Sequence, residues 1–333
     1  TGINNNVTVV DPNNNHNVVA TIPTGDVSMA IIEDPNSGYI YVTNSSSNDI
    51  TVIDPVTNTV VTTVSLLTAP GQNPVSLIAA NGLIYITAAA GVGSAGGVVI
   101  MDPSNNFSLT SLPLLPQNSP TDVVLAPNGN LYFSYNTIGG SGVVLVFDPN
   151  TNSVINTIPT GFNATSINLL IDANGYIYVH SLSTDIVYVI DSNTDMVIAS
   201  PSGFSNNTAF ILDNMAVGPN GLIYVTHNLL NASTSTISII DPNNNFSVTH
   251  NVTTLQANAT GYGQAIYSGT ISSANPITNT TNYMPTVDGE QICVTRNAGC
   301  YEQTTITFAL DPSCAPVCAL TDAGLVVGTC SDE

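Results

Sequence analysis

The chain alternates short apolar segments with polar turns along almost its whole length. Residues 39–64 show the pattern, because YIYVTN, ITVIDP and NTVVTTV are three apolar segments separated by Ser, Asn, Asp and Pro. Segments of this kind, rich in Val, Ile and Tyr, are typical of β-strands. No window holds a sustained apolar period of 3.6 residues, so we expect almost no helix.

The same pattern returns about every 43 to 50 residues. Its second segment reads GYIYVTN at 38–44, GLIYITA at 82–88, GNLYFSY at 129–135, GYIYVHS at 175–181, GLIYVTH at 221–227 and, more weakly, GEQICVTRN at 289–297. Each of the first five copies has one apolar segment before it and two after it, so each repeat predicts four strands. The third segment ends in Asp54, Asp102, Asp148, Asp191 or Asp241. We interpret this aspartate as a turn residue whose carboxylate accepts backbone hydrogen bonds.

A four-stranded unit of this length cannot cover both faces of its own sheet. Packing such units face to face around an axis buries those faces, and this arrangement is the β-propeller. We therefore predict an all-β chain folded as a β-propeller of six four-stranded blades, with seven blades as the alternative.

The first repeat also resembles a known family. YVTN at 41–44, followed by ITVIDPVTNTVV, is similar to the YVTN β-propeller repeat of archaeal surface-layer and other secreted proteins. The resemblance covers about residues 26 to 297 and weakens where YITA, YFSY and CVTR replace the motif. It implies a propeller in an extracellular setting. The motif residues of the family are structural, so the resemblance implies no catalytic residue.

We expect residues 1–333 to form a single propeller domain with two unusual ends. VTVVDPNNN at 7–15 and TITFALDPS at 305–313 both resemble third strands, which gives seven third strands for six second strands. Residues 1–23 are predicted to form a strand pair that either closes the ring or is donated to a neighbouring molecule. Residues 298–333 form a Cys-rich strand segment that could fill the same places. Because a free strand edge is a template for another chain, the surplus pair favours assembly into a filament or array.

Composition and charge exclude several partners. Apolar residues make up 43% of the chain and charged residues 7%, with no lysine, a single arginine (Arg296) and a net charge of −21. A chain with one cation cannot neutralise a phosphate backbone, so we expect no nucleic-acid binding. No apolar run is long enough to span a bilayer, so we expect no membrane insertion. No signal peptide is recognisable, and the start TGINNNVTVV is expected to be a processed end.

Sequons and cysteines favour an extracellular or cell-surface protein. Ten Asn-x-Ser/Thr sequons are candidate sites for N-linked glycans: Asn6, Asn44, Asn106, Asn163, Asn206, Asn231, Asn245, Asn251, Asn258 and Asn279. All five cysteines are close to the C-terminus and are candidates for disulfides: Cys293, Cys300, Cys314, Cys318 and Cys330. Zinc is the rival interpretation, although no histidine lies nearby and no paired CxxC exists.

The candidate chemistry is sparse. Aligning the repeats predicts a ring of polar residues where the innermost strands meet the central channel: Ser28, Ser76, Asp122, Asn168, Asn214 and Gln264. Such a ring could hold calcium or a sugar, as in lactonase-like propeller enzymes, but a metal site needs more carboxylates than the one present. The alternative interpretation is that these residues line a wet channel. His16, His180, His227 and His250 show no metal-ligand spacing, and GVGSAGG at 91–97 lacks the lysine of a phosphate loop.

These observations predict a secreted, glycosylated structural protein that binds copies of itself by strand-edge pairing, with no cofactor, no metal and no enzyme activity. A monomeric extracellular binding module for carbohydrate or protein is the alternative. A lactonase-like or lyase-like enzyme is a third, less favoured hypothesis.

Overall fold

The computed structural model describes only part of the chain. The described residues are 5–14, 16–67, 73–89, 96–112, 119–136, 141–163, 167–181, 186–202, 204, 210–229, 234–255, 291–295, 303–307, 318–321 and 324–327. The chain divides into two compact units, residues 1–266 and 267–333, and each is described by itself. No described residue belongs to an α-helix, and none forms a helix able to cross a membrane.

The first unit contains five four-stranded antiparallel sheets, one for each complete repeat. Blade 1 comprises β3 (Ser28–Glu33), β4 (Ile40–Asn44), β5 (Asp49–Asp54) and β6 (Thr59–Ser65). Blade 2 comprises β7 (Pro74–Ala80), β8 (Leu83–Ala88), β9 (Gly97–Asp102) and β10 (Ser108–Leu112), with the 3-10 turn η1 (Pro103–Asn105) before the last strand. Blade 3 comprises β11 (Ser119–Leu125), β12 (Leu131–Asn136), β13 (Ser141–Asp148) and β14 (Ser153–Asn163).

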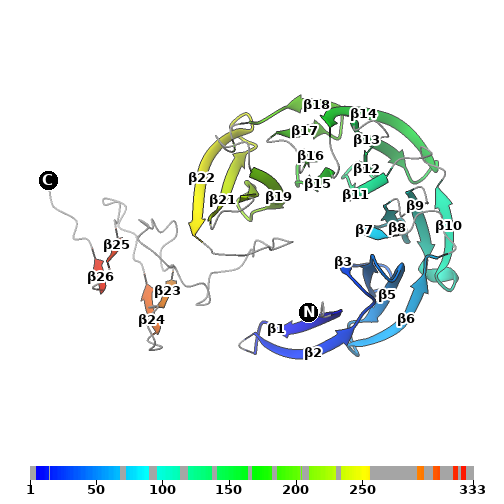
Figure 1. Ribbon diagram of the computed structural model, residues 1–333, viewed down its shortest axis with the longest axis horizontal. Coiled ribbons are helices and arrows are strands. Elements are labelled where there is room, and N and C mark those ends of the chain that lie inside the picture. Colours follow the sequence, from blue (N-terminus) through cyan, green and yellow to red (C-terminus); the bar gives the residue numbers. More distant parts are fainter. Residues whose placement is uncertain are drawn as a thin grey trace. The chain divides into compact units, whose positions relative to one another are not determined.

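Blades 4 and 5 repeat the same strand order. Blade 4 comprises β15 (Ile167–Ile171), β16 (Tyr176–Ser181), β17 (Val187–Asp191) and β18 (Met196–Ala199). Blade 5 comprises β19 (Phe210–Val217), β20 (Ile223–Leu229), β21 (Thr234–Asp241) and β22 (Ser247–Leu255). Within this unit the first strands lie innermost and the fourth strands outermost (Figure 1), and the first strands of successive blades contact one another.

Two kinds of turn hold each blade in register. In the five blades, the glycine that opens the second-strand motif has a left-handed φ between 71° and 86°, which a residue with a Cβ adopts only at a cost. At the end of each third strand, the aspartate carboxylate accepts a hydrogen bond from the backbone amide two residues on; for Asp54 and Val56 the distance is 2.8 Å. Asp11, Asp102, Asp148, Asp191 and Asp241 make the same bond at 2.8–2.9 Å. The predicted turn role of these aspartates is therefore confirmed.

The core lies between the blades. Tyr85 and Phe147 of blades 2 and 3 pack edge to face with ring centroids 6.1 Å apart, and similar apolar clusters fill the other junctions. Among the described residues, five second-strand tyrosines are fully buried: Tyr41, Tyr85, Tyr132, Tyr135 and Tyr178. Blades 1 to 4 bury both faces of their middle strands, whereas on blade 5 the described residues of β20 and β21 alternate between buried and half-buried. The all-β propeller prediction is confirmed in its coarse form. The number of blades stays a prediction.

The N-terminal residues form a two-stranded ribbon, β1 (Asn6–Asp11) with β2 (Asn17–Pro23). One face of the ribbon packs Val7, Val9 and Ile22 against Val42 and Ile53 of blade 1. The backbone amide of Thr24 also donates to the Asn5 carbonyl at 3.0 Å. The ribbon is therefore attached to blade 1 in the manner of a neighbouring blade.

The second unit is described only as two hairpins, by their backbone alone. β23 (Gln291–Thr295) pairs with β24 (Gln303–Thr307), and β25 (Cys318–Thr321) pairs with β26 (Gly324–Val327). Cys293 and Cys318 lie on β23 and β25, whereas Cys300, Cys314 and Cys330 fall outside the described residues. The predicted disulfides stay predictions.

Candidate functional site

The innermost strands carry the predicted polar ring, and their register explains how its side chains are aimed. In blades 1, 2, 3 and 5 the pairing of the first strand with the second is interrupted by an irregularity near the ring position. Irregularities of this kind re-aim a side chain and leave backbone groups without a ladder partner. A buried hydroxyl of the second strand supplies the partner in blades 1 and 2: Thr43 Oγ1 accepts from Ala30 N at 2.9 Å, and Thr87 Oγ1 accepts from Ser76 N at 3.1 Å.

These bonds define the structurally equivalent positions. In blade 1 the equivalent of Ser76 is Ala30, whereas Ser28 lies two residues earlier. Ser28 donates instead to Asn44 Oδ1 at 2.9 Å and is exposed. The alignment of the repeats placed Ser28 in the ring, because the repeat pattern does not reveal the register shift between Ser28 and Ile31.

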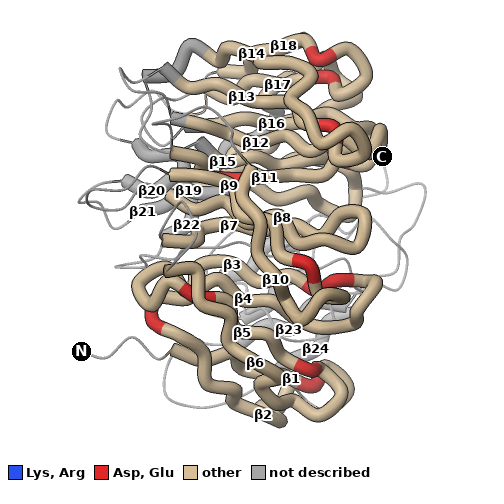
Figure 2. The backbone as a smooth tube through the Cα atoms, turned by 90° about the vertical axis from the view of Figure 1, so that its right-hand side faces the viewer, with Lys and Arg blue, Asp and Glu red and all other residues tan. Residues whose placement is uncertain are grey.

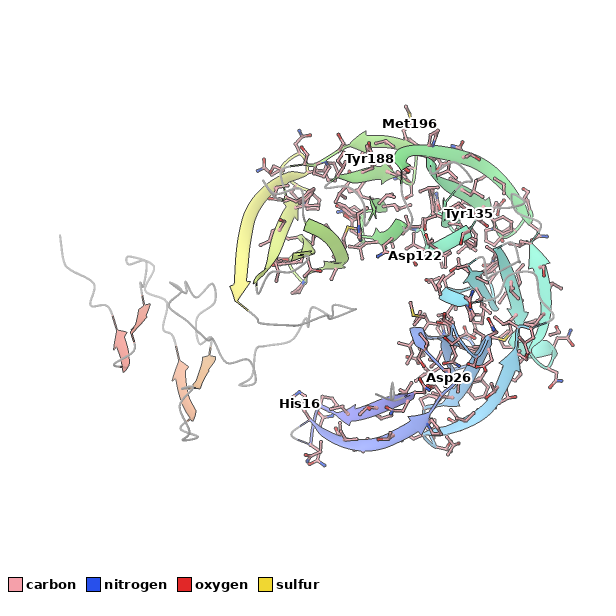
Figure 3. The ribbon with its side chains drawn as sticks, viewed as in Figure 1. His16, Asp26, Asp122, Tyr135, Tyr188 and Met196 are labelled. Carbon is pink, nitrogen blue, oxygen red and sulfur yellow. The ribbon has the colours of Figure 1, made fainter. Side chains whose placement is uncertain are left out.

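The structure joins two of the ring residues, Ser76 and Asp122, and a backbone amide next to Asn168 reaches the same carboxylate. Figure 3 labels Asp122 on its innermost strand. Ser76 Oγ of blade 2 donates to Asp122 Oδ1 at 2.7 Å, and Leu169 N of blade 4 donates to Asp122 Oδ2 at 2.8 Å. Val123 N adds a bond to Oδ1 at 2.9 Å. One carboxylate of blade 3 therefore joins the first strands of three consecutive blades.

Desolvation shifts the pKa of Asp122. Burial raises the pKa of this carboxyl above its ordinary value, although the bonds from Leu169, Ser76 and Val123 act in the opposite direction. Both carboxylate oxygens accept hydrogen bonds from protein donors, so the carboxylate links neighbouring blades. Among the described residues no group of three or more His, Cys, Asp or Glu side chains could hold a metal ion.

The remaining ring positions lie on β15, on β19 or outside the described residues. Asn168 is half-buried on β15, opposite the fully buried His180 of β16. His180 takes the place that Thr87 holds in blade 2, and the sequence analysis did not assign it this role. Asn214 follows the irregularity in β19, where only the backbone is described, and Gln264 lies outside the described residues.

Other interblade bonds lie at the strand turns. Tyr132 Oη of blade 3 donates to the Ser192 carbonyl of blade 4 at 3.1 Å and to Asp195 Oδ1 at 2.5 Å. Asn128 Nδ2 donates to the same carbonyl at 2.6 Å. The sequence analysis assigned no hydrogen-bonding role to the repeat tyrosine. No signal near Tyr132 in the sequence points to these partners, because Ser192 and Asp195 lie 60 and 63 positions further along the chain.

The predicted glycosylation sites sort by exposure. Asn44 is fully buried and donates to Asp49 Oδ1 at 2.7 Å and to Thr51 Oγ1 at 2.8 Å. Asn6 is half-buried, whereas Asn106 and Asn245 are exposed. Only the backbone is described at Asn163 and Asn251, and four others lie outside the described residues: Asn206, Asn231, Asn258 and Asn279.

All charged Asp, Glu, Lys and Arg side chains in the described part of the chain are acidic. Arg296 lies outside the described residues, so the drawn tube carries acidic positions alone, mostly at strand ends and turns (Figure 2). None of the outermost strands β2, β6, β10, β14, β18 and β22 contains an acidic residue.

Comparison with known proteins supports the fold and nothing finer. No protein-family model matches the chain, and no curated protein matches it. Among solved structures, the Dos1 propeller is 14% identical, with a TM-score of 0.58 over 76% of this chain and 66% of that one. The β-propeller domain of Cps50 (Swd1) from Myceliophteria thermophila is 12% identical, with a TM-score of 0.56 over 74% and 80%.

Virginiamycin B lyase from Staphylococcus aureus is 10% identical, with a TM-score of 0.52 over 92% of this chain and 85% of the lyase. Sheet order, interblade packing and these similarities together define a β-propeller protein. Identities this low carry the fold alone. The resemblance to YVTN-repeat surface proteins therefore stays a prediction.

Proposed function

We propose that this β-propeller is a secreted structural protein that assembles with copies of itself through strand-edge pairing at the N-terminal ribbon. The observation that carries the proposal is that the ribbon β1–β2 is the outer half of a blade. β1 ends in Asp11 with the same turn as Asp54, and its pairing slips between Val9 and Val10 as that of β5 slips between Val52 and Ile53. The ribbon therefore corresponds to the third and fourth strands of a blade.

The inner half of this blade is absent from the described pairings of the ribbon, because β1 pairs only with β2 there. The weak sixth second-strand motif lies on β23, which would be the natural partner for ring closure. In the described hairpin β23 pairs instead with β24, a third strand from its own neighbourhood in the sequence. The third strands β1 and β24 thus compete for the second strand β23. A strand from another copy of the protein would pair with the free edge of β1.

The free face of the ribbon supports the same proposal. The matching strand β5 is buried on both faces, whereas on β1 Thr8 is exposed and Val10 is 44% exposed. Val18, opposite Val10, is also exposed. A strand pair that fits one neighbour and leaves an uncharged apolar face open is suited to a second molecule.

Composition supports the extracellular setting and the absence of catalysis. The chain has no lysine, one arginine, ten sequons and five cysteines, which is typical of a secreted, glycosylated protein in an oxidising compartment. We assign no catalytic role to the polar ring, because the Asp122 oxygens accept from protein donors in three blades. A monomeric binding module is the competing function.

Imaging of the purified protein by negative stain, with size-exclusion chromatography, tests the proposal. Wild-type protein should form polymers. Val10→Lys, which places a charge on the open face of the ribbon, should reduce them, and so should a chain lacking residues 1–22. Val56→Lys is the matched control, because Val56 is 89% exposed in a turn of blade 1. Dispersed wild-type particles, or equal polymers from Val10→Lys, would refute self-assembly through the ribbon and favour a monomeric module.

A further inference from the structure

The outer edges of the blades are of two kinds. In the ribbon and in blades 1, 3 and 4, a β-bulge inserts one extra residue into the fourth strand directly after the turn. The inserted residues are Val19, Val61, Ile155 and Ile198, and each is between 43% and 52% exposed. Figure 3 shows Met196, at the start of β18, pointing away from its blade. These four outer edges are therefore apolar as well as uncharged.

Blades 2 and 5 lack this apolar insertion. The β9–β10 pairing has no bulge, and the residue inserted into β22 is Thr249. Their turns carry Asn-Phe-Ser instead, as Asn106-Phe107-Ser108 and as Asn245 with the two residues that follow it. The two blades without an apolar insertion are thus the two whose turn forms a glycosylation sequon.

The turn geometry presents both asparagines to solvent. Asn106 and Phe107 have φ values of 51° and 56°, and Asn245 and Phe246 have 52° and 54°. The phenylalanine of each turn is held by the core; the Phe246 ring lies edge to face with Tyr176 at 5.1 Å. With the aromatic ring packed inward, the preceding asparagine lies exposed at the end of the outer strand.

The other third-to-fourth-strand turns do not offer an acceptor. Their left-handed residues are His16, Asn58, Asn152 and Asp195, and none of these begins an Asn-x-Ser/Thr sequence. The sequon at Asn44 is closed for a different reason, since its amide is buried and hydrogen bonded. The exposed turn sequons therefore lie on blades 2 and 5, whereas the apolar insertions in the outer strand lie on the ribbon and on blades 1, 3 and 4.

Sheet edges are usually protected from edge-to-edge association by charged residues, above all lysine. This chain has no lysine, and its outer strands contain no acidic residue. We propose that Asn106 and Asn245 carry N-linked glycans, which shield the outer edges of blades 2 and 5 and confine association between copies to the other edges. The shielding role rests on the proposed self-assembly; the modification itself does not.

Peptide mapping of the protein, secreted from a host that attaches N-glycans, tests the modification. Trypsin has a single site in the chain, so cleavage before aspartate is the better choice; it separates Asn106, within residues 102–121, from Asn44, within residues 34–48. Glycans are expected on Asn106 and Asn245 and absent from Asn44. Unmodified Asn106 and Asn245, or a glycan on Asn44, would overturn the assignment.

Sequon variants test the role without altering either asparagine. Ser108→Ala and Ser247→Ala should each remove one glycan, and Ser46→Ala, which destroys the buried sequon, should remove none. By negative stain, the double variant should show at least a twofold gain in lateral contacts between particles. No gain would refute the shielding role. Polymers without these glycans would refute this inference and leave the proposed function standing. Glycosylated, dispersed particles would refute the proposed function together with the shielding role, and would leave only the modification standing.

Discussion

Replacing Asp122 by alanine tests whether one carboxylate joins three blades. The change removes the acceptor for Ser76 Oγ at 2.7 Å and for Leu169 N at 2.8 Å, both from neighbouring blades. A hydrogen bond to a charged group contributes about 1.5–3 kcal/mol to stability, and leaving the buried Leu169 amide without an acceptor costs a similar amount. Removing the carboxylate also removes the cost of its desolvation, which offsets part of the lost stability. We expect the free energy of unfolding to fall by about 2–4 kcal/mol.

The pH dependence gives a second readout from the same variant. Because burial raises the pKa of Asp122, the folded state binds its proton more tightly than the unfolded state, whose value is near 3.8. The stability of the wild type relative to Asp122→Ala should therefore grow as the pH falls through the folded pKa toward 3.8. Above the folded pKa this difference should not change with pH.

Chemical denaturation at several pH values between 4 and 7, followed by circular dichroism, measures both effects. Asp148→Ala is the control, because it removes one half-buried carboxylate and its turn bonds, all within a single blade. The interblade role of Asp122 would be refuted by a loss no larger than that of the control. It would also be refuted by a difference from wild type that stays constant with pH.

Four further substitutions probe the blade turns by denaturation. Tyr178→Phe should lower stability by about 1 kcal/mol, since it removes a buried bond of 3.1 Å to Asp172, and an unchanged midpoint would contradict this. Gly82→Ala should lower the free energy of unfolding by about 1–2 kcal/mol, because the residue has a left-handed φ. Gly175→Ala should lower it further, because the added Cβ would also lie 2.7 Å from the Ser192 side chain. Equal losses of stability in the two variants would refute the contribution of this steric contact. At Asp34, burial opposes ionisation, but hydrogen bonds from Ser37 and Asn36 outweigh it and lower the pKa of the carboxyl. The wild type should therefore lose stability relative to Asp34→Ala only as the pH falls below 3.8. A stability difference between the two proteins that does not change below pH 3.8 would contradict this.

Much of the fold was readable from the sequence because the signals are local. Apolar segments of strand length, a glycine at each first turn and an aspartate at each third strand recur with the repeat, and each acts within a few residues of itself. The five complete blades and the six aspartate turns follow from these signals. The 46-residue spacing of Ser76, Asp122, Asn168 and Asn214 also marked equivalent positions on successive blades.

Tertiary structure decided what local signals cannot carry. Ala30 rather than Ser28 matches Ser76, because the register of a strand pair depends on irregularities that leave no mark in the apolar pattern. Asn44 is a sequon in sequence and a buried hydrogen-bonding residue in space. The sequence by itself determined the blades, since strands and turns are built from neighbours along the chain; only folding decided which side chains meet between blades, because those contacts join residues more than forty positions apart.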